Sequence, residues 1–309
     1  MSTGKIEAIC LSEKRGTKKH EITSVNLIAD HGLEGDAHAG KWHRQVSFLR
    51  LEDIERFKSE GADVVPGDFG ENLVISGLDE NILKVGAEIH IGDALLRISQ
   101  IGKECHNHCA IYYSVGRCVM PESGYFCEVI RPGTVSVGDS VTAEYVKETI
   151  PLRACIITLS DRAADGEYED RSGPVIEERL REKGYEIIER IILPDNADSL
   201  RNNLIHLCDQ RFPDLILTTG GTGFSVKDIT PEATLSVADR NVPGIAEAIR
   251  YESMKITKNA MLSRAVSVIR KKTLIVNLPG SPKACLECMD VFLDVIPHGL
   301  HILRGNLEE

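Results

Sequence analysis

The stretch Leu215-Ile216-Leu217-Thr218-Thr219-Gly220-Gly221-Thr222-Gly223 decides the fold of the second half of this 309-residue chain. Its apolar start predicts a buried strand. The glycine-rich turn that follows allows backbone N–H groups to approach an anion without obstruction by a Cβ atom. The chain then turns at Asp228 and is predicted to enter a helix near Pro231. The stretch matches neither GxGxxG nor GxxxxGK[ST], so two interpretations stay open: a phosphate cradle and a plain turn.

Around this stretch, apolar runs alternate with helical patterns. Strands are predicted over 154–159, 186–193, 215–218 and 273–278, and helices over 172–184, 198–213, 231–238, 244–255 and 281–303. Alternation of this kind is typical of a three-layer α/β domain. We therefore predict such a domain, with a mainly parallel sheet, over residues 152–309.

The first half of the chain has a different pattern of predicted elements. Short β-type segments separated by glycine turns are predicted as strands over 6–11, 22–29, 46–49, 72–76, 88–91, 94–98, 125–130 and 140–145, with one helix over 51–60. Many short strands leave exposed edges unless the sheet closes on itself. We therefore predict a mostly-β barrel over residues 1–147, joined to the second domain by a short linker.

Composition limits the class of protein. The apolar content of 42% and charged content of 27% are typical of a soluble globular protein, and no apolar run is long enough to span a membrane. A net charge of −11 argues against nonspecific nucleic-acid binding. Nine cysteines without secretory features favour a cytoplasmic protein with free thiols.

Polar loops follow several strands of the second domain. In open parallel sheets, ligands collect at the carboxyl ends of the strands, so hydroxyls, glycine amides and the carboxylates of Asp195 and Asp228 are expected to converge on one crevice. Structural alternatives stay open here too. Asp195 is also a plausible turn residue, and Asp228 a cap for a helix beginning at Thr230.

A cluster of cysteine and histidine, Cys105-His106-Asn107-His108-Cys109, stands out in the first domain. It fits a zinc site only partly, because its C-x₃-C spacing is not the usual C-x₂-C knuckle. Two other interpretations stay open. Either these side chains are packed in the domain or have no chemical role, or Cys105 is a reactive thiolate whose pKa is lowered by Lys103 and the two histidines.

The second domain resembles the MogA/MoaB family of molybdenum cofactor biosynthesis. The resemblance rests on residues 158–174 (TLSDRAADGEYEDRSGP), 218–234 and 274–284 (LIVNLPGSPKA) and runs over nearly all of 153–309. It implies an α/β fold, commonly trimeric, that binds molybdopterin and, in MogA-type members, adenylates it with Mg-ATP. The segment 267–272 departs from the family because it lacks the glycines that many relatives have there.

The resemblance also implies roles for particular residues. Asp195 and Asp228 match the functional aspartates, and a pair of carboxylates beside an anion cradle needs a cation between them, so we expect both to hold Mg²⁺ bridging the triphosphate of ATP. The matching binding positions are Thr158, Ser160, Asp161, Gly220, Gly221, Thr222, Gly223, Thr230, Glu247, Arg250, Pro279, Gly280 and Ser281.

The first domain resembles the MOSC domain found in molybdenum cofactor sulfurases. The resemblance rests on segments 32–38, 43–46, 69–73, 103–105 and 138–139 and spans about residues 5–145. It implies that this domain binds the cofactor or its pterin and that Cys105 carries sulfur as a persulfide. His38, His43 and Arg44 are then candidate contacts to the pterin or its phosphate, with a purely structural role as the alternative.

Both resemblances point to one ligand. The sequence thus predicts a cytoplasmic enzyme that adenylates molybdopterin, a homotrimer through its second domain, with a molybdenum insertase and molybdoenzymes as protein partners. The competing hypothesis is a non-catalytic molybdopterin carrier. A zinc-stabilised regulatory module in the first domain is a third.

Overall fold

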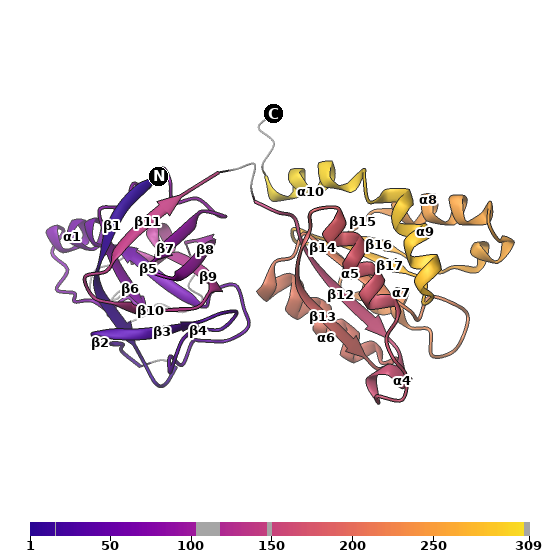
Figure 1. Cartoon of the computed structure of the whole chain (residues 1–309), viewed down its shortest axis with the longest axis horizontal. Helices are drawn as coiled ribbons and strands as arrows, with labels where there is room; N and C mark the ends of the chain where they lie inside the picture. Colours follow the sequence, from indigo (N-terminus) through magenta and orange to yellow (C-terminus); the bar gives the residue numbers. More distant parts are fainter. Residues whose placement is uncertain (16, 103–117, 147–149, 306–309) are drawn as a thin grey trace. The chain divides into compact units, whose positions relative to one another are not determined.

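A computed structural model of the chain describes residues 1–15, 17–102, 118–146 and 150–305 (Figure 1). The chain forms two compact units, Met1–Ile150 and Pro151–Glu309. In the described ranges, no helix combines the length and the apolar character needed to cross a membrane.

The first unit is built on one closed sheet. Its strands are β1 (Ser2–Leu11), β2 (His20–Ile22), β5 (Val46–Arg50), β6 (Leu73–Ser76), β7 (Glu88–Ile91), β8 (Ala94–Ile101), β9 (Tyr125–Arg131) and β11 (Ser140–Glu144). They are arranged in the order β11-β7-β8-β9-β5-β6-β1-β2, and an additional pairing of β11 with β1 closes the barrel. The predicted mostly-β barrel is confirmed.

Buried and partly exposed residues alternate along barrel strands such as β7, and the buried residues form the interior. In β7, Ile89 and Ile91 are fully buried, whereas Glu88 and His90 face outward. Successive side chains of a strand point to opposite faces, so each strand contributes its apolar set to one core. The predicted helix is present as α1 (Leu51–Ser59), which packs Ile54 and Phe57 into a second apolar cluster.

Short elements in this unit were not predicted. They are β4 (Gly32–Leu33), β10 (Gly133–Ser136) and α3 (Met120–Ser123); β4 and β10 pair with β3 (Ser24–Ile28) in a second small sheet. Elements of two to four residues are too short to show a periodicity in sequence.

The second unit contains a mixed sheet, in which a parallel part is extended by antiparallel strands. Its strands are β12 (Arg153–Leu159), β13 (Glu186–Leu193), β14 (Leu215–Thr219), β15 (Arg240–Asn241), β16 (Ser267–Arg270) and β17 (Thr273–Leu278), in the order β13-β12-β14-β17-β16-β15. The first four in this order are parallel, but β16 and β15 continue the sheet in antiparallel fashion. The prediction omitted these two strands.

Helices cover both faces of this sheet (Figure 1). They are α4 (Asp161–Ala164), α5 (Ser172–Glu182), α6 (Ala197–His206), α7 (Thr230–Ser236), α8 (Pro243–Met254), α9 (Pro282–Phe292) and α10 (Ile296–Arg304), with a π-helical turn η2 (Leu207–Arg211) and a 3₁₀ turn η3 (Lys258–Leu262). Ala154 and Ile156 of β12 pack with α5, α8, α9 and α10, whereas Cys155 and Ile157 pack with α6 and α7. The predicted three layers are therefore present.

The last predicted helix, 281–303, is two helices. The chain turns after Phe292, and α10 starts again at Ile296 with Pro297 in its first turn. Proline lacks the N–H group that a continuous helix needs in its interior, but it is tolerated in a first turn.

Candidate functional site

The strand ends of the second unit lie side by side. Thr158 of β12 pairs with Thr219 of β14, which in turn pairs with Leu278 of β17. On the other side of β12, Leu159 pairs with Leu193 of β13. The loops that follow these four strands therefore start at one edge of the sheet, as ligand-binding loops of parallel sheets do.

The glycine turn after β14 requires glycine. Gly220 and Gly221 have φ angles of 98° and 65°, a region that other residues rarely adopt. A Cβ atom at Gly220 would lie 2.5 Å from the carbonyl oxygen of Leu159, and one at Gly221 would lie 2.4 Å from Oγ1 of Thr230. The buried hydroxyl of Thr230 donates to the carbonyl of Gly220 at 2.9 Å, which fixes the turn against the start of α7.

The turn leaves donors unused. The backbone amides of Gly221, Thr222 and Gly223 make no hydrogen bond to the described part of the chain. Backbone N–H groups are obligatory donors, so three consecutive unpaired ones form a concavity suited to an anion.

Asp161 and Asp195 tie two of the loops together. The amide of Asp195 donates to Oδ1 of Asp161 at 2.9 Å, and the amide of Asp161 donates to Oδ2 of Asp195 at 3.2 Å. The second oxygen of Asp161 forms an ion pair with Lys227. This ion pair joins the loop after β12 to the loop that follows the glycine turn.

Asp228 lies over the glycine turn. Its Oδ2 accepts a hydrogen bond from the amide of Ser225 at 2.8 Å, and a Cβ atom at Gly223 would lie 2.9 Å from this oxygen. Its other oxygen has no hydrogen bond from the described residues. Ile229, not Asp228, occupies the cap position of α7 and makes no side-chain cap, so Asp228 does not cap this helix.

Electrostatics link the two predicted metal ligands. Burial raises the pKa of Asp195, and the negative charges of Asp161 and Asp228 raise it further. The structure thus brings Asp161, Asp195, Lys227 and Asp228 into one electrostatic cluster. A carboxylate whose charged form is disfavoured by neighbouring carboxylates is a fitting ligand for a divalent cation.

Three hydroxyl groups at predicted binding positions have hydrogen-bond partners within the domain. Thr158 donates to Asp170 at 3.0 Å, and the hydroxyl of Ser160 caps α4 by accepting from Ala163 at 3.2 Å. Ser281 caps α9 in the same way, accepting from Ala284 at 3.3 Å. The amide of Ser160 donates to the carbonyl of Leu193 at 2.9 Å, and the hydroxyl groups of all three residues shape the loops.

The loop after β17 approaches the glycine turn. A Cβ atom at Gly280 would lie 3.5 Å from Cα of Gly220, and the carbonyl of Pro279 accepts from the hydroxyl of Thr219 at 2.7 Å. Together with the start of α9 at Ser281, this loop lies beside the glycine turn at the sheet edge.

Candidate residues of the barrel form a basic and aromatic group. The half-buried guanidinium of Arg44 lies 4.8 Å from the ring centre of Trp42 and 5.7 Å from that of Phe126. Burial lowers the pKa of Arg44, and its Nε is buried without a hydrogen-bond partner in the described residues. An unpaired cation held between aromatic rings suits an anionic, planar ligand.

The two histidines near Arg44 have partners inside the barrel. His43 is buried, and its Nε2 lies 2.8 Å from Oε1 of Gln100. His38 lies 3.7 Å from the buried carboxylate of Asp36. Cys105 and its neighbours lie outside the described residues.

Comparison with known proteins identifies both domains. Residues 155–298 match the family described as "Probable molybdopterin binding domain", and residues 35–142 match the family described as "MOSC domain". Over 153 residues the chain is 42% identical to the molybdopterin adenylyltransferase of Helicobacter pylori J99, covering 49% of this chain and 87% of the relative. The chain belongs to the MogA/MoaB family and also contains a MOSC domain.

Other relatives match the same half. The molybdopterin adenylyltransferase of Escherichia coli K12 is 42% identical over 156 residues, which cover 48% of this chain and 80% of the relative. The solved structure of the molybdopterin biosynthesis enzyme MoaB from Thermus thermophilus is 41% identical, with 50% of this chain and 97% of that chain covered and a TM-score of 0.48.

Two predicted contacts of the MogA/MoaB domain lie on α8. Arg250 donates to the carbonyl of Ala265 at 2.8 Å and so holds the segment after η3. Glu247 is exposed. In the described residues, neither forms a hydrogen bond or ion pair with the aspartate cluster.

Two residues of this site were missed in the sequence. The sequence did not single out Lys227, because lysines are common on surfaces. Its position next to Asp228 does, however, indicate that it lies near the site. Arg264 donates through Nε to the carbonyl of Gly223 at 2.6 Å and through Nη2 to that of Asp228. Nothing in the local sequence around Arg264 predicts this long-range contact.

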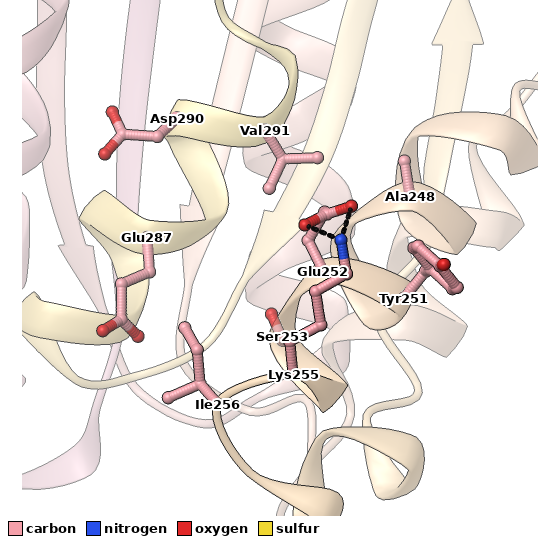
Figure 2. A pocket seen from close by; sticks show the side chains of 9 residues that line it. All are labelled: Ala248, Tyr251, Glu252, Ser253, Lys255, Ile256, Glu287, Asp290 and Val291. Carbon is pink, nitrogen blue, oxygen red and sulfur yellow. Dashed lines mark hydrogen bonds and ion pairs between the residues drawn. The ribbon is translucent and has the colours of Figure 1, made fainter.

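A hollow of about 740 Å³ lies elsewhere on the MogA/MoaB domain, between α8 and α9 (Figure 2). It is lined by Ala248, Tyr251, Glu252, Ser253, Lys255, Ile256, Glu287, Asp290 and Val291. It shares no residue with the loops at the sheet edge. Of its three carboxylates, that of Glu252 is paired with Lys255 at 2.7 Å.

The MOSC domain carries one group of side chains with metal-ligand chemistry in the described ranges. Oxygens of Glu88 and Glu144 lie 3.8 and 3.4 Å from Nε2 of His90 on the outer face of the barrel. Arg97 pairs with the other oxygen of Glu88 at 3.3 Å. About one third of each of the three side chains is exposed, as in a surface ion-pair cluster.

Proposed function

We propose that the MogA/MoaB domain transfers the adenylyl group of Mg-ATP to the terminal phosphate of molybdopterin. The observation that carries this proposal is the cluster of Asp161, Asp195, Lys227 and Asp228 beside a glycine turn with unpaired amides. Relatives that are 42% identical over this domain are named molybdopterin adenylyltransferases, which supports the same reaction.

The reaction needs charge neutralisation more than a strong base. A phosphate oxygen of molybdopterin, already ionised at neutral pH, attacks the α-phosphorus of ATP; the new P–O bond forms as the bond to pyrophosphate breaks. The amides of Gly221, Thr222 and Gly223 would hold phosphate oxygens of one substrate. Positioning and electrostatic stabilisation then supply most of the rate.

Asp195 and Asp228 fit Mg²⁺, because each carboxylate has one oxygen oriented by a backbone amide and another with no hydrogen bond from the described residues. Bound there, Mg²⁺ would offset the charge of the triphosphate. Lys227 lies on the same side of the site and would move from Asp161 to a phosphate when the substrate binds.

We propose that the MOSC domain binds the pterin or the finished cofactor. Arg44, held between Trp42 and Phe126, would contact a phosphate, with His43 and His38 lining the approach. Sulfur transfer through Cys105 stays a prediction. Mass spectrometry after incubation with a persulfide donor tests it, because a persulfide adds the mass of one sulfur atom to Cys105.

We further propose a cytoplasmic homotrimer that passes its product to a molybdenum insertase and to molybdoenzymes. The described cysteines are free thiols, as in a reducing compartment. Exposed apolar side chains on and after α8, including Tyr251, Ile256 and Met261, support burial against another copy. Light scattering coupled to size exclusion tests the trimer.

The test of the enzyme is pyrophosphate release from the full chain incubated with molybdopterin and Mg-ATP. The competing function, a molybdopterin carrier, predicts binding of molybdopterin without pyrophosphate. The second oxygens of Asp195 and Asp228, which accept no hydrogen bond within the described ranges, favour the enzyme, because a carrier has no need of two metal-ligating carboxylates beside its phosphate site.

A further inference from the structure

The loop that carries Asp228 has little support of its own. Between Gly223 and Asp228, the side chains of Phe224 and Val226 are 71% and 97% exposed. Within the loop, the amide of Ser225 donates to Asp228 Oδ2 at 2.8 Å, and the amide of Asp228 donates to the carbonyl of Ser225 at 2.9 Å. The amide of Lys227 donates to the hydroxyl of Ser225 at 3.3 Å. A short loop with an exposed tip and only three internal hydrogen bonds among the described residues is expected to open easily.

Arg264 holds this loop at both ends. Its Nε donates to the carbonyl of Gly223 at 2.6 Å, and its Nη2 donates to the carbonyl of Asp228. Its own amide donates to the carbonyl of Thr222 at 3.1 Å. One residue from the segment before β16 therefore contacts the last two residues of the glycine turn and the predicted metal ligand.

The guanidinium is itself held in place. Its third nitrogen, Nη1, forms an ion pair with Glu232 of α7, and the side chain of Arg264 is two-thirds buried. A guanidinium is planar and presents several donors in a fixed fork, so it joins two carbonyls and one carboxylate in a single geometry. A lysine ammonium at this position would lack the fork.

We infer that Arg264 is a positioning residue for adenylyl transfer, which sets Asp228 and the amides of the glycine turn in their binding geometry. This inference rests on the proposed function of the site. Arg264 contacts no reacting atom and acts through the backbone of the loop. A misplacement of about 1 Å in such a group lowers a rate by roughly 100-fold.

The experiment compares Arg264→Lys with Arg270→Lys in the full chain. Arg270 is a matched control, because it also joins a carboxylate, Asp209, to a backbone carbonyl, that of Val237, away from the site. Hydrogen exchange of the amides of Ser225 and Asp228 is measured without ligand, together with the unfolding midpoint, kcat, and KM for Mg-ATP.

Arg264→Lys is expected to raise exchange of these two amides by about 10-fold or more and to lower kcat by roughly 100-fold. The unfolding midpoint is expected to change no more than in Arg270→Lys, which leaves loop exchange and kcat unchanged. Wild-type exchange and wild-type kcat in Arg264→Lys would overturn the inference while leaving the adenylyl transfer intact.

A milder variant covers the case in which Arg264→Lys does not fold. Glu232→Gln removes only the ion pair that orients the guanidinium, and the Glu232 side chain is 60% exposed, so folding is not at risk. It is expected to raise loop exchange and to lower kcat, both by less than Arg264→Lys; no change in either would count against the inference. If the wild-type chain releases no pyrophosphate, the proposed function fails, and loop exchange alone then decides whether Arg264 orders the loop.

Discussion

Asp161 and Asp195 each accept a hydrogen bond from the backbone amide of the other, at 2.9 and 3.2 Å. This exchange joins the loops after β12 and β13 and leaves the second oxygen of Asp195 available to a cation. The pair thus links the fold of the sheet edge to the proposed chemistry.

Removing the side chain of Asp161 breaks one of the two hydrogen bonds that join the loops. Asp161→Ala is expected to weaken Mg²⁺ binding about 10-fold or more, because the amide of Asp195 loses its acceptor and Lys227 loses its ion pair. Isothermal titration of the variant with Mg²⁺ measures this. Asp165→Ala, an exposed carboxylate at the end of α4, is the control and should bind as the wild type.

Mg²⁺ affinity should also depend on pH. The pKa of Asp195 is raised, chiefly by burial, so protons compete with the metal at pH values above the ordinary range of an aspartate. Affinity is therefore expected to fall as the pH is lowered toward this raised pKa. In Asp195→Asn, affinity should be low and lose this part of its pH dependence; a dependence equal to that of the wild type would contradict the assignment.

The barrel has its own titrating group in Glu71. Its side chain is fully buried, Oε1 accepts from the amide of Gly67 at 2.7 Å, and Oε2 has no hydrogen-bond partner among the residues that the structure describes. Burial raises its pKa from 4.5 to about 7. The unfolded chain then ionises before the folded one, so the barrel loses the contribution of this group to its stability as the pH rises from about 4.5 to about 7.

A shift of this size corresponds to about 3 kcal/mol at 1.36 kcal/mol per pH unit. Glu71→Gln should abolish the loss, whereas Glu55→Gln, on the exposed face of α1, should not. Trp42 is the only tryptophan in the chain, so its fluorescence during urea unfolding reports on the barrel alone. Equal pH dependence in Glu71→Gln and the wild type would refute the role of Glu71.

The glycine turn makes a steric prediction. Gly221→Ala should destabilise the domain by about 1–3 kcal/mol and reduce turnover, because its φ is positive and Thr230 occupies the space of a Cβ atom. Gly244→Ala on α8 meets no atom within 4 Å and should be neutral or stabilising by up to about 1 kcal/mol. Thermal unfolding of both variants provides the comparison.

In the MOSC domain, Arg44→Gln is expected to lower the affinity for molybdopterin about 10-fold or more, because it removes the charge held between Trp42 and Phe126. Quenching of Trp42 fluorescence by the ligand provides the measurement. Lys41→Gln removes an exposed charge nearby and serves as the control. Undiminished affinity in Arg44→Gln would remove Arg44 from the site.

The sequence predicted what local patterns encode. Apolar runs such as 154–159 and 273–278 gave the central strands, and their order placed the polar loops at one edge of the sheet. It did not predict β16 (Ser267–Arg270) or β15 (Arg240–Asn241), because short segments with charged residues lack a strand pattern.

The features of the site that the sequence did not predict depend on contacts between distant segments. Thr158, Ser160 and Ser281 stay predicted ligand contacts, and the sequence did not show that their hydroxyl groups also hold the loops. Arg264 joins the site from 36 residues beyond Asp228, through carbonyl groups that any residue would offer. Such a contact depends on tertiary structure and leaves no local motif.

The central claim is that Asp228 and Asp195 serve adenylyl transfer at this edge of the sheet. Its most direct test is pyrophosphate release from molybdopterin and Mg-ATP by the wild-type chain and by Asp228→Asn. The account predicts release by the wild type and a loss of at least about 100-fold in the variant, with molybdopterin binding retained. Full turnover by Asp228→Asn, or molybdopterin binding without pyrophosphate release by the wild type, would contradict it.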